Sequence, residues 1–200
     1  MDPASVAIVL LTAALAFLVG SVNPAALLAR ARGADLLTSG SGNPGATNAG
    51  RVLGRKWGVL VLVLDVLKAY LPTLLALEVL GLVPALVAGF AVVLGHVFSP
   101  FLGGRGGKGV ACAVGAVLAV EPLVALGVLV AFLVTFAALS YIGRAVVVVT
   151  GLLLLFGVVA GLGAVPGIEP VVGWWLAALS ALVLSRHRRN IRAWWERQRR

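Results

Sequence analysis

Residues 110–141 read VACAVGAVLAVEPLVALGVLVAFLVTFAALSY, a long apolar run whose one charged residue is Glu121. As a single helix at about 1.5 Å per residue, the run would be about 48 Å long. The hydrocarbon core of a bilayer is only about 30 Å thick. Because proline disturbs the preceding helical turn and Pro122 follows Glu121, the run predicts two helices with a break at Glu121-Pro122.

The rest of the chain also has the composition of a membrane protein. Of its 200 residues, 61% are hydrophobic and 12% are charged, and the mean hydropathy is +1.09. One soluble core cannot enclose that much apolar surface. We expect an all-α fold, a polytopic membrane helix bundle that forms a single domain over residues 1–200. Its seven predicted spans are residues 6–28, 57–77, 83–102, 110–120, 124–139, 145–165 and 171–184.

The distribution of charge predicts the orientation, since cytoplasmic connections collect Lys and Arg and translocated connections do not. Cations follow the first, third, fifth and last predicted spans, and single acids mark the alternate ends: Asp2, Glu78, Glu121 and Glu169. This alternation places the N-terminus outside and the C-terminus in the cytoplasm. A five-span alternative would leave Glu121 or Arg144 at membrane depth. The net charge of +9 is explained by orientation and by attraction to anionic lipid, with no nucleic acid partner.

Two further residues, Asp2 and Cys112, argue against a cleaved signal segment and against a cysteine-based structural site. A secretory signal begins with cations, whereas this chain has Asp2, so we expect the first span to be retained. Cys112 is the only cysteine, which excludes an internal disulfide and a cysteine-rich structural metal site. We expect Cys112 to be a small core residue.

The first of three polar segments, residues 39–51, reads SGSGNPGATNAGR. Glycines allow close approach of a ligand to the main chain, short polar side chains add hydrogen bonds, and Arg51 adds a fork that suits phosphate. The segment is a candidate anion cradle, although an ordinary turn-rich connection is the alternative. Its candidate site residues are Gly40, Ser41, Gly42, Asn43, Thr47, Asn48 and Arg51.

The second segment, residues 95–109, reads GHVFSPFLGGRGGKG. We expect its glycines to expose consecutive backbone N–H groups to an anion, beside the positive end of a helix that begins near Val110. A Walker A loop is excluded because it requires Gly at Leu102 and Ser or Thr at Gly109. A flexible connection is the alternative. The candidate site residues are His96, Arg105, Gly106, Gly107, Lys108 and Gly109.

The third segment, residues 186–196, reads RHRRNIRAWWE. His187 and Asn190 would share one face if the last helix continues past the membrane; a basic membrane anchor is the alternative. Asp65 and Lys68, three residues apart in the second span, carry charges that are costly at membrane depth. We expect them to neutralise each other or to meet polar groups inside the bundle.

Together, the three segments resemble the bacterial membrane glycerol-3-phosphate acyltransferases that use acyl phosphate, the PlsY family. The family motifs run approximately GSGN-x-GATN-x-x-R, GH…F-x-GGKGVA and H-R-x-N-I. Here they read GSGNPGATNAGR at residues 40–51, Gly95-His96 followed by GGKGVA at 106–111, and HRRNI at 187–191. Departures from the family pattern are Gly104, Arg105, Gly143 and the absence of a Gly-x-Glu after residue 196.

The resemblance implies a reaction in the bacterial inner membrane with its active site on the cytoplasmic face. A fatty acyl group passes from acyl phosphate to the sn-1 hydroxyl of glycerol 3-phosphate, giving lysophosphatidic acid and inorganic phosphate. It implies no metal, no cofactor and no obligate protein partner. Ser41 and Arg51 are carried over as essential, residues 106–109 as a phosphate cradle, and His187 and Asn190 as active-site residues.

An acyl phosphate is already activated, so positioning and charge stabilisation suffice. We therefore expect direct attack without an acyl-enzyme, with Ser41 as a hydrogen-bond partner and Arg51, Lys108 and His187 holding phosphate. His96, His187 or a substrate phosphate oxygen would accept the proton. The rival classes are a transporter of a phosphorylated anion, which lacks a matching outer gate here, and a scaffold that binds anionic lipid, which leaves residues 40–51 unexplained.

Overall fold

The computed structural model describes residues 2–188, 191, 192 and 194, and within these residues the secondary structure is entirely helical. The chain divides into two compact units, Met1–Val120 and Glu121–Arg200. The single domain expected over residues 1–200 stays a prediction. The first unit contains α1 (Pro3–Ser21), α2 (Pro24–Arg30), α3 (Ala46–Val52), α4 (Arg55–Leu80), α5 (Leu82–Val97), the 3-10 helix η1 (Pro100–Leu102) and α6 (Val110–Val120); the second contains α7 (Pro122–Leu139), α8 (Ile142–Gly161) and α9 (Pro170–Ser185).

Proline and capping side chains set several helix boundaries. The predicted break at Glu121-Pro122 is confirmed, because α6 ends at Val120 and Pro122 occupies the first turn of α7, where its missing N–H is harmless. The stretch 6–28, expected as one helix, is broken instead. Asn23 accepts a hydrogen bond from the Ala26 N–H (2.8 Å) and so caps α2 ahead of Pro24.

The architecture is that of a polytopic membrane helix bundle. Among the described residues, five helical segments are long and apolar enough to cross a bilayer, whereas α6 and α9 are shorter apolar helices. Large apolar side chains are widely exposed, among them Leu123 at 81% and Leu155 at 62%, as expected of surfaces that lipid solvates. The five long segments are Pro3–Arg30, Arg55–Leu80, Leu82–Leu102, Pro122–Leu139 and Ile142–Gly161.

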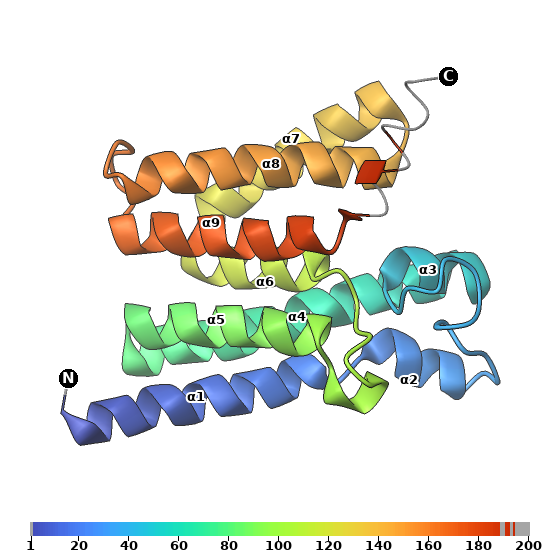
Figure 1. Ribbon diagram of the computed structural model, residues 1–200, viewed down its shortest axis with the longest axis horizontal. Helices are drawn as coiled ribbons and strands as arrows, with labels where there is room; N and C mark the ends of the chain where they lie inside the picture. The colour runs from blue at the N-terminus through green and yellow to red at the C-terminus, as the bar shows by residue number, and fades with distance from the viewer. Residues whose placement is uncertain (1, 189–190, 193, 195–200) are drawn as a thin grey trace. The chain divides into compact units, whose positions relative to one another are not determined.

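Glycines bring the helices of the first unit into close contact. A Cβ at Gly20 of α1 would overlap the Val92 carbonyl oxygen of α5, and one at Gly95 of α5 would overlap the Phe17 carbonyl oxygen of α1. Small residues of this kind drive helix association in membranes. Figure 1 shows α1 alongside α5, with the N-terminus and the α4–α5 turn at one end of this unit and α2, α3 and η1 at the other.

Helix α6 packs closely against the middle of α4. A Cβ at Gly115 of α6 would overlap the Val66 carbonyl oxygen of α4, and the Cys112 sulfur lies within 4.8 Å of the Asp65 carboxylate. At about 1.5 Å per residue, α6 therefore begins about 10 Å along α4 from Arg55.

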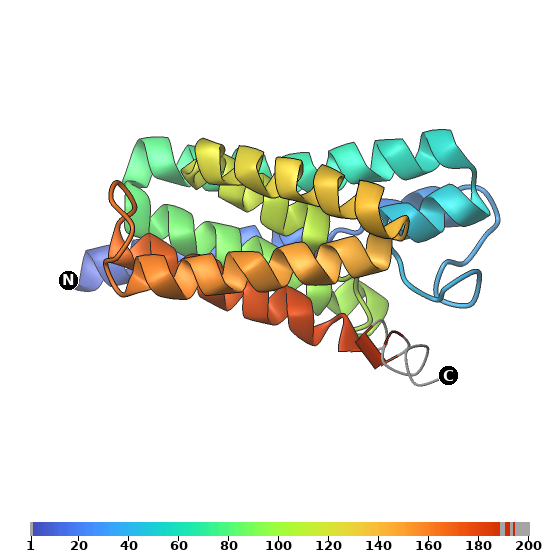
Figure 2. The same cartoon turned by 90° about the horizontal axis from the view of Figure 1, so that it is seen from above.

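In the second unit, α8 and α9 pack closely and run side by side in both views (Figures 1 and 2). A Cβ at Gly157 would lie 2.6 Å from the Ala177 nitrogen, and one at Gly173 would overlap the Gly161 nitrogen. At one end of the unit, the Arg144 guanidinium lies 5.9 Å from the ring centroid of Trp194. The first turn of α8 thus contacts the C-terminal segment.

Candidate active site

The first polar segment is organised by the side chain of Asn48, which is 1% exposed. Its Oδ1 accepts a hydrogen bond from the Ser41 N–H (2.8 Å), and its Nδ2 donates to the carbonyl oxygens of Ser39 (3.0 Å) and Leu36 (3.2 Å). Gly40 has φ +63°, and a Cβ there would overlap the Asn48 Oδ1, so the tight turn requires glycine. One buried amide therefore fixes the path of residues 36–41.

Below this loop lies a small apolar core that holds α2 and α3 against α4. It consists of Ala25, Ala29, Leu36, Ala49 and Val61. Above it, Thr47 and Arg51 stand four residues apart on α3 and are both exposed, so they share one helix face. Ser41, Gly40 and Gly42 are exposed, and Asn43 is partly exposed. The segment therefore presents a hydroxyl and guanidinium surface on a fixed frame.

Replacing Asn48 with alanine is expected to destabilise this loop. The change leaves the Ser41 N–H and two carbonyl oxygens without the amide, and each buried unsatisfied group costs about 1–3 kcal/mol. Thermal unfolding in detergent should show a clearly lower midpoint for Asn48→Ala. The matched control is Thr38→Ala, which removes one exposed 3.3 Å hydrogen bond to Asp35. Equal midpoints for the two variants would contradict the role of Asn48.

The second segment folds back onto the end of α5, and one prediction about it is wrong. The N–H groups of Gly104, Arg105, Gly106 and Gly107 do not face an anion in series, because each donates to a main-chain carbonyl. Gly106 donates to Val97 and Gly107 to His96, both at 3.1 Å. The glycines serve close packing: a Cβ at Gly106 would overlap the His96 carbonyl oxygen, and one at Gly107 the His96 ring.

The remaining residues of this segment differ in exposure. Arg105 is exposed, Lys108 is partly buried and Gly109 is buried. Gly109 has φ +83° and lies directly before α6, which begins at Val110 as predicted. Burial lowers the pKa of the Lys108 ammonium from its ordinary value of 10.5. The two cations therefore remain as the charged groups that this loop can offer to a ligand.

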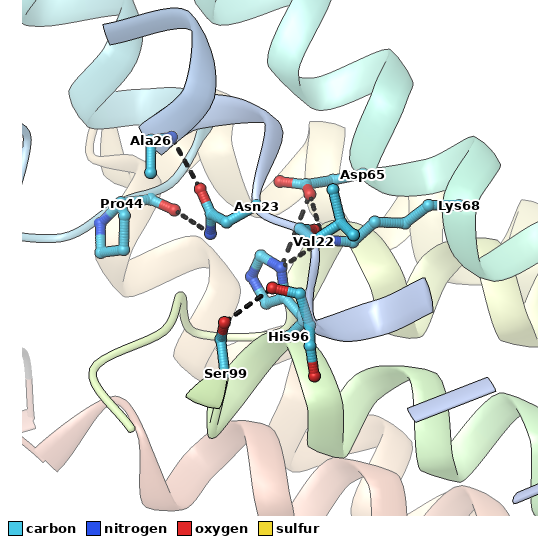
Figure 3. Close-up of polar contacts among 9 residues, drawn as sticks. Val22, Asn23, Ala26, Pro44, Asp65, Lys68, His96 and Ser99 are labelled. Carbon is cyan, nitrogen blue, oxygen red and sulfur yellow. Dashed lines mark hydrogen bonds and ion pairs between the residues drawn. The ribbon is translucent and has the colours of Figure 1, made fainter. Parts of the chain in front are cut away.

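Behind the glycine loop lies a buried polar cluster, which Figure 3 shows. The predicted pairing of Asp65 and Lys68 is confirmed by a 2.9 Å ion pair. Lys68 Nζ also lies 2.9 Å from His96 Nδ1 and 2.8 Å from the Val22 carbonyl oxygen. His96 is 3% exposed, so its ring is enclosed within the bundle.

Two residues that sequence reasoning missed join the polar connections of this unit. Ser99 Oγ donates to the Ser21 carbonyl oxygen (2.6 Å), and Asn23 Nδ2 donates to the Pro44 carbonyl oxygen (3.0 Å), as Figure 3 shows. Both are buried. Asn23-Pro24 and Ser99-Pro100 could have signalled helix starts, because a capping residue before proline is typical of that position. Their long-range partners leave no such signal.

Three potential metal donors gather in the same place. Asp65, His96 and Cys112 each bring one ligand atom within 4.8 Å of the others. The ammonium of Lys68 lies 2.9 Å from two of these donors and supplies a positive charge of the protein's own. Cys112 is fully buried, as expected for a core residue. The absence of a metal stays a prediction.

The third segment is described only in part. Helix α9 ends at Ser185, so a continuous helix does not carry His187 past that point. His187 is 3% exposed, and its Nδ1 lies 2.8 Å from the Val183 carbonyl oxygen. A carbonyl can only accept, so Nδ1 carries the proton and Nε2 is the acceptor nitrogen in the neutral ring. Asn190 and Glu196 lie outside the described residues.

The fold and these connections define a class: a polytopic membrane protein whose cationic, glycine-rich loops suit phosphate-bearing ligands. Comparison with known proteins supplies the family. Residues 10–197 match the glycerol-3-phosphate acyltransferase family. The chain belongs to this family, in its integral membrane PlsY form.

Individual relatives agree over most of the chain. The glycerol-3-phosphate acyltransferase of Aquifex aeolicus (strain VF5) is 41% identical over 178 residues, covering 88% of this chain and 90% of the relative. That of Geobacter sulfurreducens is 42% identical over 187 residues, covering 92% of each. Crystal structures of the integral membrane glycerol 3-phosphate acyltransferase PlsY match at 40% and 39% identity. Its glycerol 3-phosphate form has a TM-score of 0.84 and its lysophosphatidic acid form 0.82, and each match covers 92% of this chain and 90% of that one.

Proposed function

We propose that this glycerol-3-phosphate acyltransferase takes its acyl group from acyl phosphate, transfers it to the sn-1 hydroxyl of glycerol 3-phosphate and releases lysophosphatidic acid and inorganic phosphate. The reaction would be the first step of phospholipid synthesis. The observation that carries the proposal is the Asn48-ordered loop, which presents Ser41, Thr47 and Arg51 in a chain that matches this family over residues 10–197. The solved PlsY structures in glycerol 3-phosphate and lysophosphatidic acid forms support the choice of acceptor and product.

In the proposed reaction, the sn-1 hydroxyl oxygen attacks the carbonyl carbon of acyl phosphate. The new ester bond forms while the bond from that carbon to the phosphate oxygen breaks, and inorganic phosphate leaves. Arg51, Lys108 and His187 hold the two dianionic phosphates, since cationic donors in a partly desolvated site stabilise such charge. Ser41 donates a hydrogen bond and forms no acyl-enzyme. Asn190 is proposed as a further active-site residue of the third segment.

The hydroxyl proton needs an acceptor, and the hydrogen bonds of the two histidines distinguish them. The Lys68 ammonium can only donate, so the nearby His96 Nδ1 is an acceptor and the ring proton is on Nε2. His187 has the opposite arrangement, with its acceptor nitrogen at Nε2. We assign the proton to His187 Nε2 or to a substrate phosphate oxygen.

For the acyl chain we propose a cavity of about 220 Å³ beside the break between α1 and α2. Apolar side chains dominate its lining, and one cation lies among them. A fatty chain gains about 0.8 kcal/mol for each CH₂ removed from water, and Arg30 suits the phosphate of the same molecule. The residues that line this cavity are Val22, Asn23, Ala26, Leu27, Arg30, Phe101 and Leu102.

Purified protein in detergent, supplied with acyl phosphate and glycerol 3-phosphate, should form a lysolipid and inorganic phosphate in equal amounts. Each substrate alone should give no lysolipid. Vesicles that take up a phosphorylated anion without forming lysolipid would contradict the enzyme and support a transporter. Covalent acylation of Ser41 during turnover would contradict direct transfer.

We further propose seven crossings, with the N-terminus outside and the site at the cytoplasmic face of the inner membrane. In the second unit, Glu121 and Glu169 interact, since burial and then the Glu169 charge raise the pKa of Glu121, while Arg144 meets the C-terminal segment at Trp194. Acids and cations thus mark alternate helix ends, as orientation by positive charge requires. Glycerol 3-phosphate added outside sealed inside-out vesicles should be acylated; acylation in right-side-out vesicles without transport would contradict this topology.

The dependence of kcat/KM on pH should show the titration of Lys108. Its charged form binds phosphate, and burial lowers its pKa below 10.5, so kcat/KM should fall on the alkaline side before a free lysine would titrate. Arginine stays protonated in proteins, so Lys108→Arg should move this alkaline limb to higher pH. Steady-state rates from neutral to alkaline pH measure the shift. An unchanged limb in Lys108→Arg would assign the titration to another group.

A further inference from the structure

Lys68 is placed in an unusual way for a lysine in the middle of a membrane helix. Its side chain is 10% exposed, and an unpaired charge at such depth costs about 2.5 kcal/mol or more. Its ammonium donates to the Val22 carbonyl oxygen at 2.8 Å, lies 2.9 Å from His96 Nδ1 and forms a 2.9 Å ion pair with Asp65 Oδ1. The cation is therefore held by groups of the protein itself, as Figure 3 shows.

This arrangement fixes the orientation and tautomer of His96. Since Nδ1 accepts from the ammonium, the ring proton is on Nε2. Asp65 Oδ1 lies 3.5 Å from Nδ1 and holds the same edge of the ring. Nε2 faces the glycine loop, because a Cβ at Gly107 would overlap this atom. The ring of His96 is thus packed against Gly107, the residue that precedes Lys108.

The same ammonium is also connected to the first polar segment, through two neighbouring residues of the chain. It binds the Val22 carbonyl oxygen, and the next residue, Asn23, donates to the Pro44 carbonyl oxygen of the loop that carries Ser41. One membrane-embedded cation thus connects α4 both to the glycine loop and to the chain beneath the first segment.

We propose that Lys68 and Asp65 are positioning residues for phosphate binding: they hold the His96 ring in place against Gly107, and so set the position of the loop that ends in Lys108. The inference rests on the proposed function for the identity of the phosphate-bearing substrates. It reassigns His96 from direct contact with phosphate to the support of the loop. A metal ion at Asp65, His96 and Cys112 would have to displace the ammonium, so the wild-type protein should carry none there.

Paired substitutions at His96 separate this role from simple filling of the core. Glutamine can place its amide group where Nε2 packs against Gly107, whereas asparagine reaches only the position of Nδ1. His96→Gln should therefore keep kcat/KM close to wild type, and His96→Asn should lower it by about 100-fold, since misplacement of a site by about 1 Å costs that much. The loss should appear mainly as a higher KM for the phosphate-bearing substrates. Equal activity of the two variants would overturn the proposal.

Lys68→Met should cause a similar loss, and combining it with His96→Asn should add little, because both act through the position of one side chain. The matched control is Thr73→Val, which removes another buried hydrogen bond of α4, to the Ala69 carbonyl oxygen. Additive losses, or a Lys68→Met effect no larger than that of Thr73→Val, would show a merely structural pair. If Lys68→Met does not fold, the comparison of His96→Gln with His96→Asn tests the proposal instead.

A binding readout separates failure of this inference from failure of the proposed function. Inorganic phosphate should raise the thermal midpoint of the wild type and of His96→Gln in detergent, because a ligand of the folded state stabilises it. It should raise that of His96→Asn much less. Turnover by the wild type tests the function independently. A stoichiometric metal in the purified wild type, lost in Asp65→Asn, would overturn the assignment of Lys68 as the resident cation.

Discussion

Replacing Gly107 with alanine is expected to reduce kcat/KM by about 100-fold or more, the loss that misplaced site geometry causes. A Cβ at this position would overlap Nε2 of His96. Neither group can move easily, because the ring is enclosed and bonded to Lys68, and the Gly107 N–H is bonded to the His96 carbonyl oxygen at 3.1 Å. The added methyl group should displace the loop and with it Lys108.

The matched control is Gly104→Asn in the same loop. Gly104 is exposed, has φ +75°, and a Cβ there meets nothing within 4 Å. Asparagine tolerates the left-handed region better than other residues with a side chain. Steady-state kinetics with both substrates should therefore show near wild-type values for Gly104→Asn. A Gly107→Ala enzyme as active as this control would refute the close packing of the loop on His96.

Replacing Arg51 with alanine is expected to lower kcat/KM by about 100- to 1000-fold, the range seen when one preorganised donor to a developing charge is removed. Arg51 is exposed on α3 in line with Thr47, so its loss should leave the thermal midpoint nearly unchanged. Arg51→Lys should recover only part of the activity, because lysine keeps the charge but lacks the planar fork.

Arg55→Ala provides the control for Arg51. Arg55 is an exposed cation four residues further on, at the start of α4, and lies outside the segment that carries the site. Its removal should change kcat/KM by less than about 3-fold, as is usual for a surface charge. Equal losses at Arg51 and Arg55 would point to a general electrostatic attraction of phosphate rather than to a specific contact.

Several features of the fold could be predicted because a single residue decides them. Glu121-Pro122 ends one helix and begins the next, and the spacing of Asp65 and Lys68 predicts their ion pair, which the structure confirms. The high content of hydrophobic residues was enough to predict that lipid surrounds the helices. The break at Asn23-Pro24 carried the same kind of signal, yet the apolar run 6–28 obscured it.

The positions of the polar loops in the chain could be predicted, but their hydrogen-bond partners could not. The glycines of residues 103–109 signalled freedom of the main chain, but sequence does not reveal which carbonyls their N–H groups reach. Asn48 was expected to bind substrate because it lies among polar residues, whereas its amide is engaged with Ser41, Ser39 and Leu36. Partners this far apart in sequence are set by the folded chain.

The central claim is that the loop ordered by Asn48 binds the phosphate of the substrate through Arg51. It is tested most directly by the rise in thermal midpoint that glycerol 3-phosphate causes in detergent, because a ligand of the folded state stabilises it. The wild type and Arg55→Ala, which loses an exposed cation outside the segment, should show the same rise, and Arg51→Ala should show almost none. An equal rise in Arg51→Ala would contradict the account.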